Sequence, residues 1–163
     1  MLTDTGFPRA DAENDFLRAR RREVAGRVGY WLRRDLDRRQ LLPLDRVVNA
    51  LGRRGERRLG LETIRLDTIV GTLDTRRDFD RRFRPASNRL RSRWVHLALA
   101  ARQGEALPAI EVYRVGACHF VEDGHHRVSI ARATGQKTID AYVTEVLTAR
   151  PAAAAQACAP CAT

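Results

Sequence analysis

The feature that most constrains the fold is a stretch whose periodicity changes at one glycine. Residues 118–122, Cys-His-Phe-Val-Glu, have the composition of a buried strand, and the apolar residues after Gly124 recur at helical spacing. Glycine tolerates the backbone angles that a tight turn demands. The sequence therefore predicts a strand, a tight turn and a helix over residues 118–133, with the turn formed by residues 123–127, Asp-Gly-His-His-Arg.

The chemistry of this turn suits an anion. A helix N-terminus binds phosphate through its backbone N–H groups and the positive end of the helix dipole. The guanidinium of Arg127 is a planar fork of donors that matches phosphate oxygens, and a protonated histidine donates to phosphate as well. We therefore predict an anion site for a nucleotide phosphate. Its binding residues are Gly124, His125, His126 and Arg127.

Two residues of the turn are candidates for catalysis. The carboxylate of Asp123 could hold Mg²⁺ beside a phosphate or orient an imidazole, and His126 could move a proton near neutral pH. In the simpler interpretation Asp123 and Gly124 only make the turn, Asp123 caps the helix, and the histidines are exposed bystanders. Two histidines and an arginine are more than a cap requires, which favours a functional site.

A metal site built directly from side chains is not predicted. Adjacent histidines rarely converge on one ion, so His119, His125 and His126 are a poor ligand set. Cys158 and Cys161 form a C-x-x-C pair without the second pair that structural zinc sites carry. Cys118 lies in a predicted strand, and three cysteines in this arrangement do not indicate a disulfide framework.

The net charge of +10 points to a polyanionic partner such as DNA. The charge is carried by arginine, since Lys137 is the only lysine, and an arginine-rich surface can also reflect genome composition. Residues 76–93 are the most basic stretch, with eight arginines, two aspartates and the interleaved Phe79 and Phe83. The candidate nucleic-acid contacts are Arg76, Arg77, Arg81 and Arg82.

The rest of the pattern predicts an α/β (α+β) protein with a small mixed sheet. Residues 11–39 should form one or two amphipathic helices, whose arginines either make i, i+4 charge pairs or lie along a phosphate backbone; the pairs are the favoured interpretation. We expect a basic helical appendage over 1–60, the α/β domain over 61–147 and a disordered alanine-rich tail over 148–163. The remaining predicted elements are a helix at 44–51, a basic loop at 52–60, a strand at 61–66, a helical turn at 67–71, a helix at 87–104, a hairpin over 107–122 and a strand at 138–146.

No apolar run reaches the ~18 residues of a membrane span, and residues 1–11 have neither a basic region nor an apolar core typical of a signal peptide. We expect a cytoplasmic protein with no membrane partner.

Leu107 to Val146 resembles the core of the ParB/sulfiredoxin superfamily. The family pattern is a Pro-Pro-Ile-like strand, a hairpin, a Gly-x-x-Arg turn that opens a helix, and a closing strand. Upstream, residues 63–69 stand where ParB-like domains carry a strand and Leu-x-x-Ile, and residues 77–80, Arg-Asp-Phe-Asp, stand where they carry an arginine and a Phe-Asp pair. The resemblance covers Leu61 to Val146 and implies a small α/β domain that binds CTP, as in ParB, or ATP, as in sulfiredoxin; Mg²⁺ is expected from the carboxylate of Asp123.

The resemblance extends to single positions of the turn. Gly124 is the turn glycine, Arg127 the terminal arginine, and His126 stands where sulfiredoxin has histidine and ParB has arginine. His125 occupies the place of sulfiredoxin's reactive cysteine, and imidazole cannot form a sulfur-based intermediate, so sulfinic-acid reduction is not expected. A partition protein would continue into a helix-turn-helix and a dimerisation domain, so we do not expect a complete one.

Two classes of function follow. The preferred one is a ParB-like nucleotide-binding module, a switch or DNA-associated regulator with weak triphosphate hydrolysis. The alternative is an enzyme of the same superfamily, a kinase of a small hydroxyl substrate such as serine, or a nuclease. A kinase would need a carboxylate base, for which Glu62, Asp67, Asp74 and Asp78 are candidates. The sequence leaves open the nucleotide, its fate and the oligomeric state.

Overall fold

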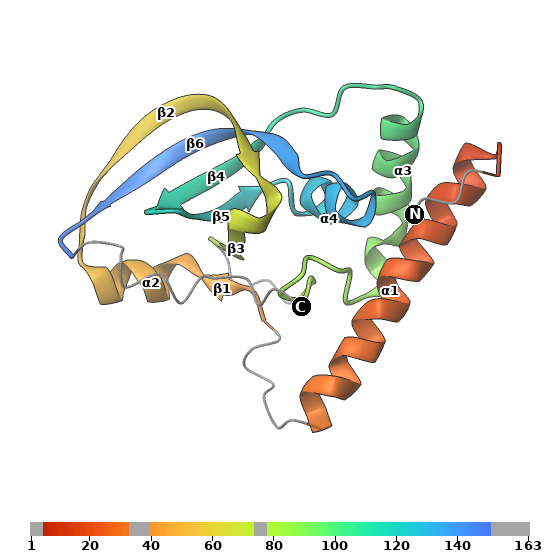
Figure 1. Ribbon diagram of the computed structural model, residues 1–163, viewed down its shortest axis with the longest axis horizontal. Coiled ribbons are helices and arrows are strands. Elements are labelled where there is room, and N and C mark those ends of the chain that lie inside the picture. Colours follow the sequence, from red (N-terminus) through yellow and green to blue (C-terminus); the bar gives the residue numbers. More distant parts are fainter. Residues whose placement is uncertain (1–4, 33–39, 74–77, 151–163) are drawn as a thin grey trace. The chain divides into compact units, whose positions relative to one another are not determined.

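The computed structural model describes residues 5–32, 40–73 and 78–150, and these form two compact units that alternate along the sequence (Figure 1). The helical unit comprises Met1–Leu41, Arg76–Pro108 and His125–Gln136. The sheet unit comprises Leu42–Thr75, Ala109–Gly124 and Lys137–Thr163.

The sheet unit contains a six-stranded mixed sheet in the order β1-β3-β5-β4-β6-β2. The pairs β1–β3, β3–β5 and β4–β6 are parallel, whereas β4–β5 and β2–β6 are antiparallel. Its elements are β1 (Leu42–Pro43), α2 (Leu44–Leu51), β2 (Arg53–Arg65), the 3-10 turn η2 (Leu66–Thr68), β3 (Ile69–Thr72), β4 (Ile110–Val115), β5 (Cys118–Asp123) and β6 (Thr138–Thr148).

The helix α2 buries one face in the core of the sheet unit. Leu44, Val48 and Leu51 are spaced at i, i+4 and i+7, so they lie on one side of the helix. They cluster with Phe120, which is fully buried, and with Val146. The predicted helix at 44–51 is confirmed.

The helical unit consists of α1 (Pro8–Leu32), the 3-10 turn η3 (Asn88–Leu90), α3 (Arg91–Arg102) and α4 (His125–Ala133). Phe16 of α1 meets Trp94 of α3 edge to face, with ring centroids 5.6 Å apart, and both rings are fully buried. The indole Nε1 of Trp94 donates to Ser129 Oγ of α4 at 2.9 Å. These contacts join three segments that lie far apart in the sequence into one core.

The predicted fold class is confirmed, as are the strand, turn and helix over 118–133 and the hairpin that precedes them. The predicted loop at 52–60 is wrong, because these residues are the first part of β2 and pair with β6 from Arg53 onward. Register shifts next to Gly55 and Gly60 allow the pairing of β2 with β6 to continue past both glycines. The division expected at residue 60 falls inside this strand.

Two further expectations are modified. The helical turn expected at 67–71 is shorter: η2 covers residues 66–68, and β3 begins at Ile69 because it pairs with β5. Residues 8–32 form a single helix. The alanine-rich tail from residue 151 onward lies outside the described residues. Within the described ranges, no helix is both long enough and apolar enough to cross a membrane.

Candidate functional site

The predicted turn joins the end of β5 to the start of α4. Asp123 is the last residue of β5, Gly124 has a φ of +104°, and His125 is the first residue of α4. A φ in this range is strained for any residue with a Cβ, which explains the glycine. His126 and Arg127 therefore lie in the first turn of a nine-residue helix, at the positive end of its dipole.

The two histidines differ in exposure. His125 is 4% exposed and His126 is half-buried. The ring of Phe79 lies 6.0 Å from that of His125 at an interplanar angle of 22°, and 5.2 Å from that of His126 at 88°. Phe83 lies 6.0 Å from His125. The imidazole of His125 is thus packed against both phenylalanine rings, which also contact each other at 6.5 Å. Of the predicted phosphate-binding side chains, His126 and Arg127 are half-buried, and the Nε2 atom of His126 is itself buried.

The loop that carries both phenylalanines is held by Asp80. This buried carboxylate accepts the backbone N–H groups of Arg82 at 3.0 Å and Arg84 at 2.8 Å, and also the Nε of Arg84 at 2.7 Å. Within the loop Phe83 has a φ of +57°, an unfavourable value for a bulky residue. Because the hydrogen bonds to Asp80 overdetermine the loop, they can keep Phe83 in this conformation against His125.

The predicted phosphate ligand Arg127 is oriented by the backbone. Its Nη1 donates to the carbonyl oxygen of Pro108 at 2.6 Å. This bond fixes the direction of the guanidinium, whose planar set of five N–H donors matches phosphate oxygens.

Sequence reasoning missed the role of Asp80 and the contact between the phenylalanines and the histidines. An aspartate two residues before Arg82, in a loop closed by Pro85, is a signal for a side chain that caps nearby N–H groups. The packing of this loop on α4 has no such signal, because the two segments are more than 40 residues apart.

The candidate nucleic-acid residues lie partly in the same loop. Arg81 and Arg82 are exposed, while Arg76 and Arg77 fall outside the described residues. On α1, the predicted charge pairs are present: Arg9 and Arg27 lie within 4 Å of Glu13 and Glu23, respectively, four residues away. Several basic side chains of this unit are therefore neutralised within it.

No group of three His, Cys, Asp or Glu side chains within the described ranges could hold a metal ion. His119 belongs to the sheet unit, where its Nδ1 lies 2.8 Å from Thr68 Oγ1, and His125 and His126 belong to the helical unit. Asp123 is exposed beside the turn glycine. A single carboxylate fits a Mg²⁺ ion that arrives on nucleotide phosphates rather than an all-protein site.

The carboxylates considered as kinase bases are in different settings. Glu62 lies 3.5 Å from the guanidinium of Arg114, and Asp67 accepts the Nε of Arg65 at 3.0 Å. The ion pair with Arg65 holds the pKa of the Asp67 carboxyl below its usual value. Asp78 is exposed and directly precedes Phe79, and Asp74 lies outside the described residues.

Comparison of the chain with family models, curated proteins and solved structures gives no match. The ParB/sulfiredoxin resemblance rests on the sequence motifs alone.

Proposed function

We propose that this chain is a ParB-like module that binds a nucleoside triphosphate, CTP or ATP, through Gly124, His125, His126 and Arg127. The observation that carries the proposal is the turn itself: a strand, a glycine at φ +104° and a helix opened by His-His-Arg. This geometry supports an anion at the helix N-terminus.

The burial of the side chains suggests a division of roles. Arg127, which is partly exposed, is the side chain best suited to contact phosphate oxygens, and His126 would reach phosphate through Nδ1 because its Nε2 is buried. His125 is buried against Phe79 and Phe83, so its part would be to fix the start of α4 and present backbone. Asp123 would share a Mg²⁺ ion with the phosphates, and the ion would neutralise phosphate charge.

A nucleotide switch would need no catalytic base. Nucleotide contacts at His126 could alter the loop held by Asp80, because the ring of Phe79 in that loop contacts the ring of His126. The alternative is phosphoryl transfer to a small hydroxyl substrate such as serine. Among the described carboxylates, Asp78 is the best candidate for the base of such a kinase, because it is exposed and directly precedes Phe79. Weak triphosphate hydrolysis fits either function.

The first experiment is calorimetric titration of the full chain with CTP, ATP and ADP, with and without Mg²⁺. We expect one triphosphate to bind, and His126→Ala and Arg127→Ala each to weaken binding by at least about tenfold, because each removes a charge-assisted contact worth roughly 1.5–3 kcal/mol. The matched controls are His96→Ala and Arg89→Ala, which change exposed residues of the same types elsewhere in the helical unit.

Unchanged affinity in both turn variants would remove the phosphate site, and failure of every nucleotide to bind would remove the proposed function. An assay of phosphate release with added serine separates the two classes. Turnover that rises with serine, and is lost in Asp78→Asn, would replace the switch with a kinase.

DNA is the proposed macromolecular partner, contacted by Arg76, Arg77, Arg81 and Arg82. Contacts of arginine with phosphates release counterions, so affinity should fall steeply as salt rises. Fluorescence anisotropy of a labelled duplex between about 50 and 200 mM salt measures this slope. Arg81→Gln with Arg82→Gln should make the slope shallower, and a salt-independent signal would contradict electrostatic binding to DNA.

A further inference from the structure

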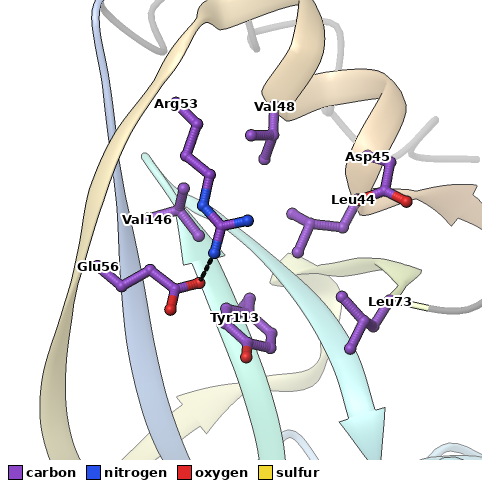
Figure 2. A pocket seen from close by; sticks show the side chains of 8 residues that line it. All are labelled: Leu44, Asp45, Val48, Arg53, Glu56, Leu73, Tyr113 and Val146. Carbon is purple, nitrogen blue, oxygen red and sulfur yellow. Dashed lines mark hydrogen bonds and ion pairs between the residues drawn. The ribbon is translucent and has the colours of Figure 1, made fainter.

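The sheet unit has a small pocket between α2 and the sheet. Its volume is about 140 Å³, and Figure 2 shows its lining side chains. The inner wall is aliphatic and comes from α2, the residue that follows β3, and β6. The aliphatic residues are Leu44, Val48, Leu73 and Val146.

The lining of the pocket carries three charged side chains: Asp45 of α2, and the oppositely charged Arg53 and Glu56 of β2. Arg53 and Glu56 are three residues apart on β2, a spacing that places side chains on opposite faces of a regular strand. A register shift between Arg53 and Gly55 changes this alternation, and both side chains line the same pocket. Bulges commonly re-aim side chains in this way beside binding sites.

Arg53 and Glu56 pair with each other, and the carboxylate of Asp45 gives the lining one formal negative charge in excess. The Nη2 of Arg53 lies 2.5 Å from Oε1 of Glu56, and the side chains are 56% and 33% exposed. Figure 2 shows them pointing toward each other beside Tyr113. Ion pairs this exposed contribute little to stability, so a ligand that offers matching charges can open the pair at small cost.

Tyr113 of β4 also lines the pocket. Burial, together with the charges of Glu122 and Glu56, raises the pKa of Tyr113. The phenol is protonated at neutral pH and adds no charge to the lining.

We propose that this pocket binds a free α-amino acid with an aliphatic side chain. The ligand carboxylate would pair with the guanidinium of Arg53, its ammonium with the carboxylate of Glu56, and its side chain would lie against the aliphatic wall. A zwitterion replaces both halves of the ion pair at once, whereas an acid or an amine alone leaves one rim charge without its partner. This site lies in the sheet unit and is independent of the proposed nucleotide site.

The volume of the pocket limits the size of the amino acid that it can bind. A cavity of roughly 150 Å³ lined by aliphatic groups holds a benzene-sized molecule. The observed 140 Å³ includes the space beside Arg53 and Glu56, so it suits an aliphatic amino acid no larger than leucine as a whole, and alanine would leave part of the aliphatic wall uncovered.

The test uses the full chain and L-leucine as the probe, with binding followed by calorimetry and by ligand-detected NMR. We expect saturable 1:1 binding of leucine. Alanine, 3-methylbutylamine and 4-methylpentanoate should each bind at least about tenfold more weakly, since each lacks the side chain or one charged group. Equal affinity for the amine or the acid would overturn the zwitterion assignment.

Variants locate the site. Arg53→Gln and Glu56→Gln should each weaken leucine binding at least about tenfold, because each removes one charged contact. Arg57→Gln is the matched control: it removes another arginine of β2, whose 2.6 Å ion pair with Glu145 of β6 lies away from the pocket lining. Leu73→Phe, at the half-buried edge of the pocket, should fill it and abolish binding, with the thermal melt as a check of folding. The absence of leucine binding, or leucine affinity that is unchanged in Arg53→Gln and Glu56→Gln, would overturn the proposal.

Discussion

At the scale of single residues, His119 of β5 is an ionisable group held in a buried setting. Its side chain is buried, and a hydrogen bond joins its Nδ1 to Thr68 Oγ1. Thr68 already donates its only hydroxyl proton to the carbonyl of Arg65, so the Nδ1 of His119 must carry the proton. Within the described part of the chain, His119 Nε2 is buried without a hydrogen-bond partner. A neutral imidazole is the form that this setting favours.

We therefore predict that His119 makes the protein sensitive to acid. Burial, with a smaller effect from the charge of Arg114, lowers the pKa of His119 from 6.5 to about 4. Between these values the unfolded chain binds the proton and the folded protein does not, so the free energy of unfolding falls as the pH drops from 6.5 toward 4. The loss should be on the order of 3 kcal/mol.

Urea denaturation at pH 7 and pH 4.5 measures this effect. His119→Gln should show a smaller difference between the two pH values than the natural sequence. His96→Gln, which changes an exposed histidine, should behave like the natural sequence. An identical pH dependence in all three proteins would show that His119 does not titrate as its burial implies.

At the scale of secondary structure, β1 and β3 come together only because one position lacks a side chain. Gly71 of β3 pairs with Leu42 of β1 and with Phe120 of β5. A Cβ at this position would lie 2.1 Å from the carbonyl oxygen of Leu42 and 2.6 Å from the Phe120 ring. The close approach of three strands at this point requires glycine.

Gly71→Ala should therefore destabilise the sheet unit by about 1–3 kcal/mol or more, since the oxygen of Leu42 is backbone and cannot rotate away. Thermal or urea denaturation measures the change, and hydrogen exchange should show the loss in β1 and β3. Gly55→Ala is the control, because a Cβ there meets nothing within 4 Å. It should alter stability by less than about 0.5 kcal/mol. Similar effects of both substitutions would contradict the packing of these strands.

At the scale of the whole molecule, the order of segments in the sequence differs from their grouping in space. Each unit is assembled from three separate stretches of chain. In the helical unit, Phe16, Trp94 and Ile130 come from α1, α3 and α4 and share one core. The segment expected to be an appendage therefore supplies part of the core on which α4 packs.

Phe16→Ala should cost about 3–5 kcal/mol, the usual range for removing a fully buried aromatic ring. Because the core is shared, amide hydrogen exchange should rise in α3 and α4 as well as in α1. Leu17→Ala changes the neighbouring residue, which is 39% exposed, and should leave exchange nearly unchanged. Faster exchange confined to α1 would show that the three helices do not form one cooperative unit.

The sequence by itself determined the local structure around the candidate site. The strand over 118–122, Gly124 and the helical spacing after it each have a local cause, so the turn could be predicted together with the residues it presents. The same holds for the hairpin before it and for α2. The loop expected at 52–60 failed because Gly55 and Gly60 read locally as turn signals, whereas pairing with β6 and two register shifts make these residues a strand.

Only the tertiary structure decided what surrounds these elements. Phe79 and Phe83 bury His125, Asp80 holds their loop, and Phe16 joins α1 to Trp94. Arg53 and Glu56 share a pocket because a bulge turns them to one face. The physical reason is common to all of them: local periodicity depends on neighbours within a few residues, whereas burial and pairing depend on segments that meet only after the chain has folded.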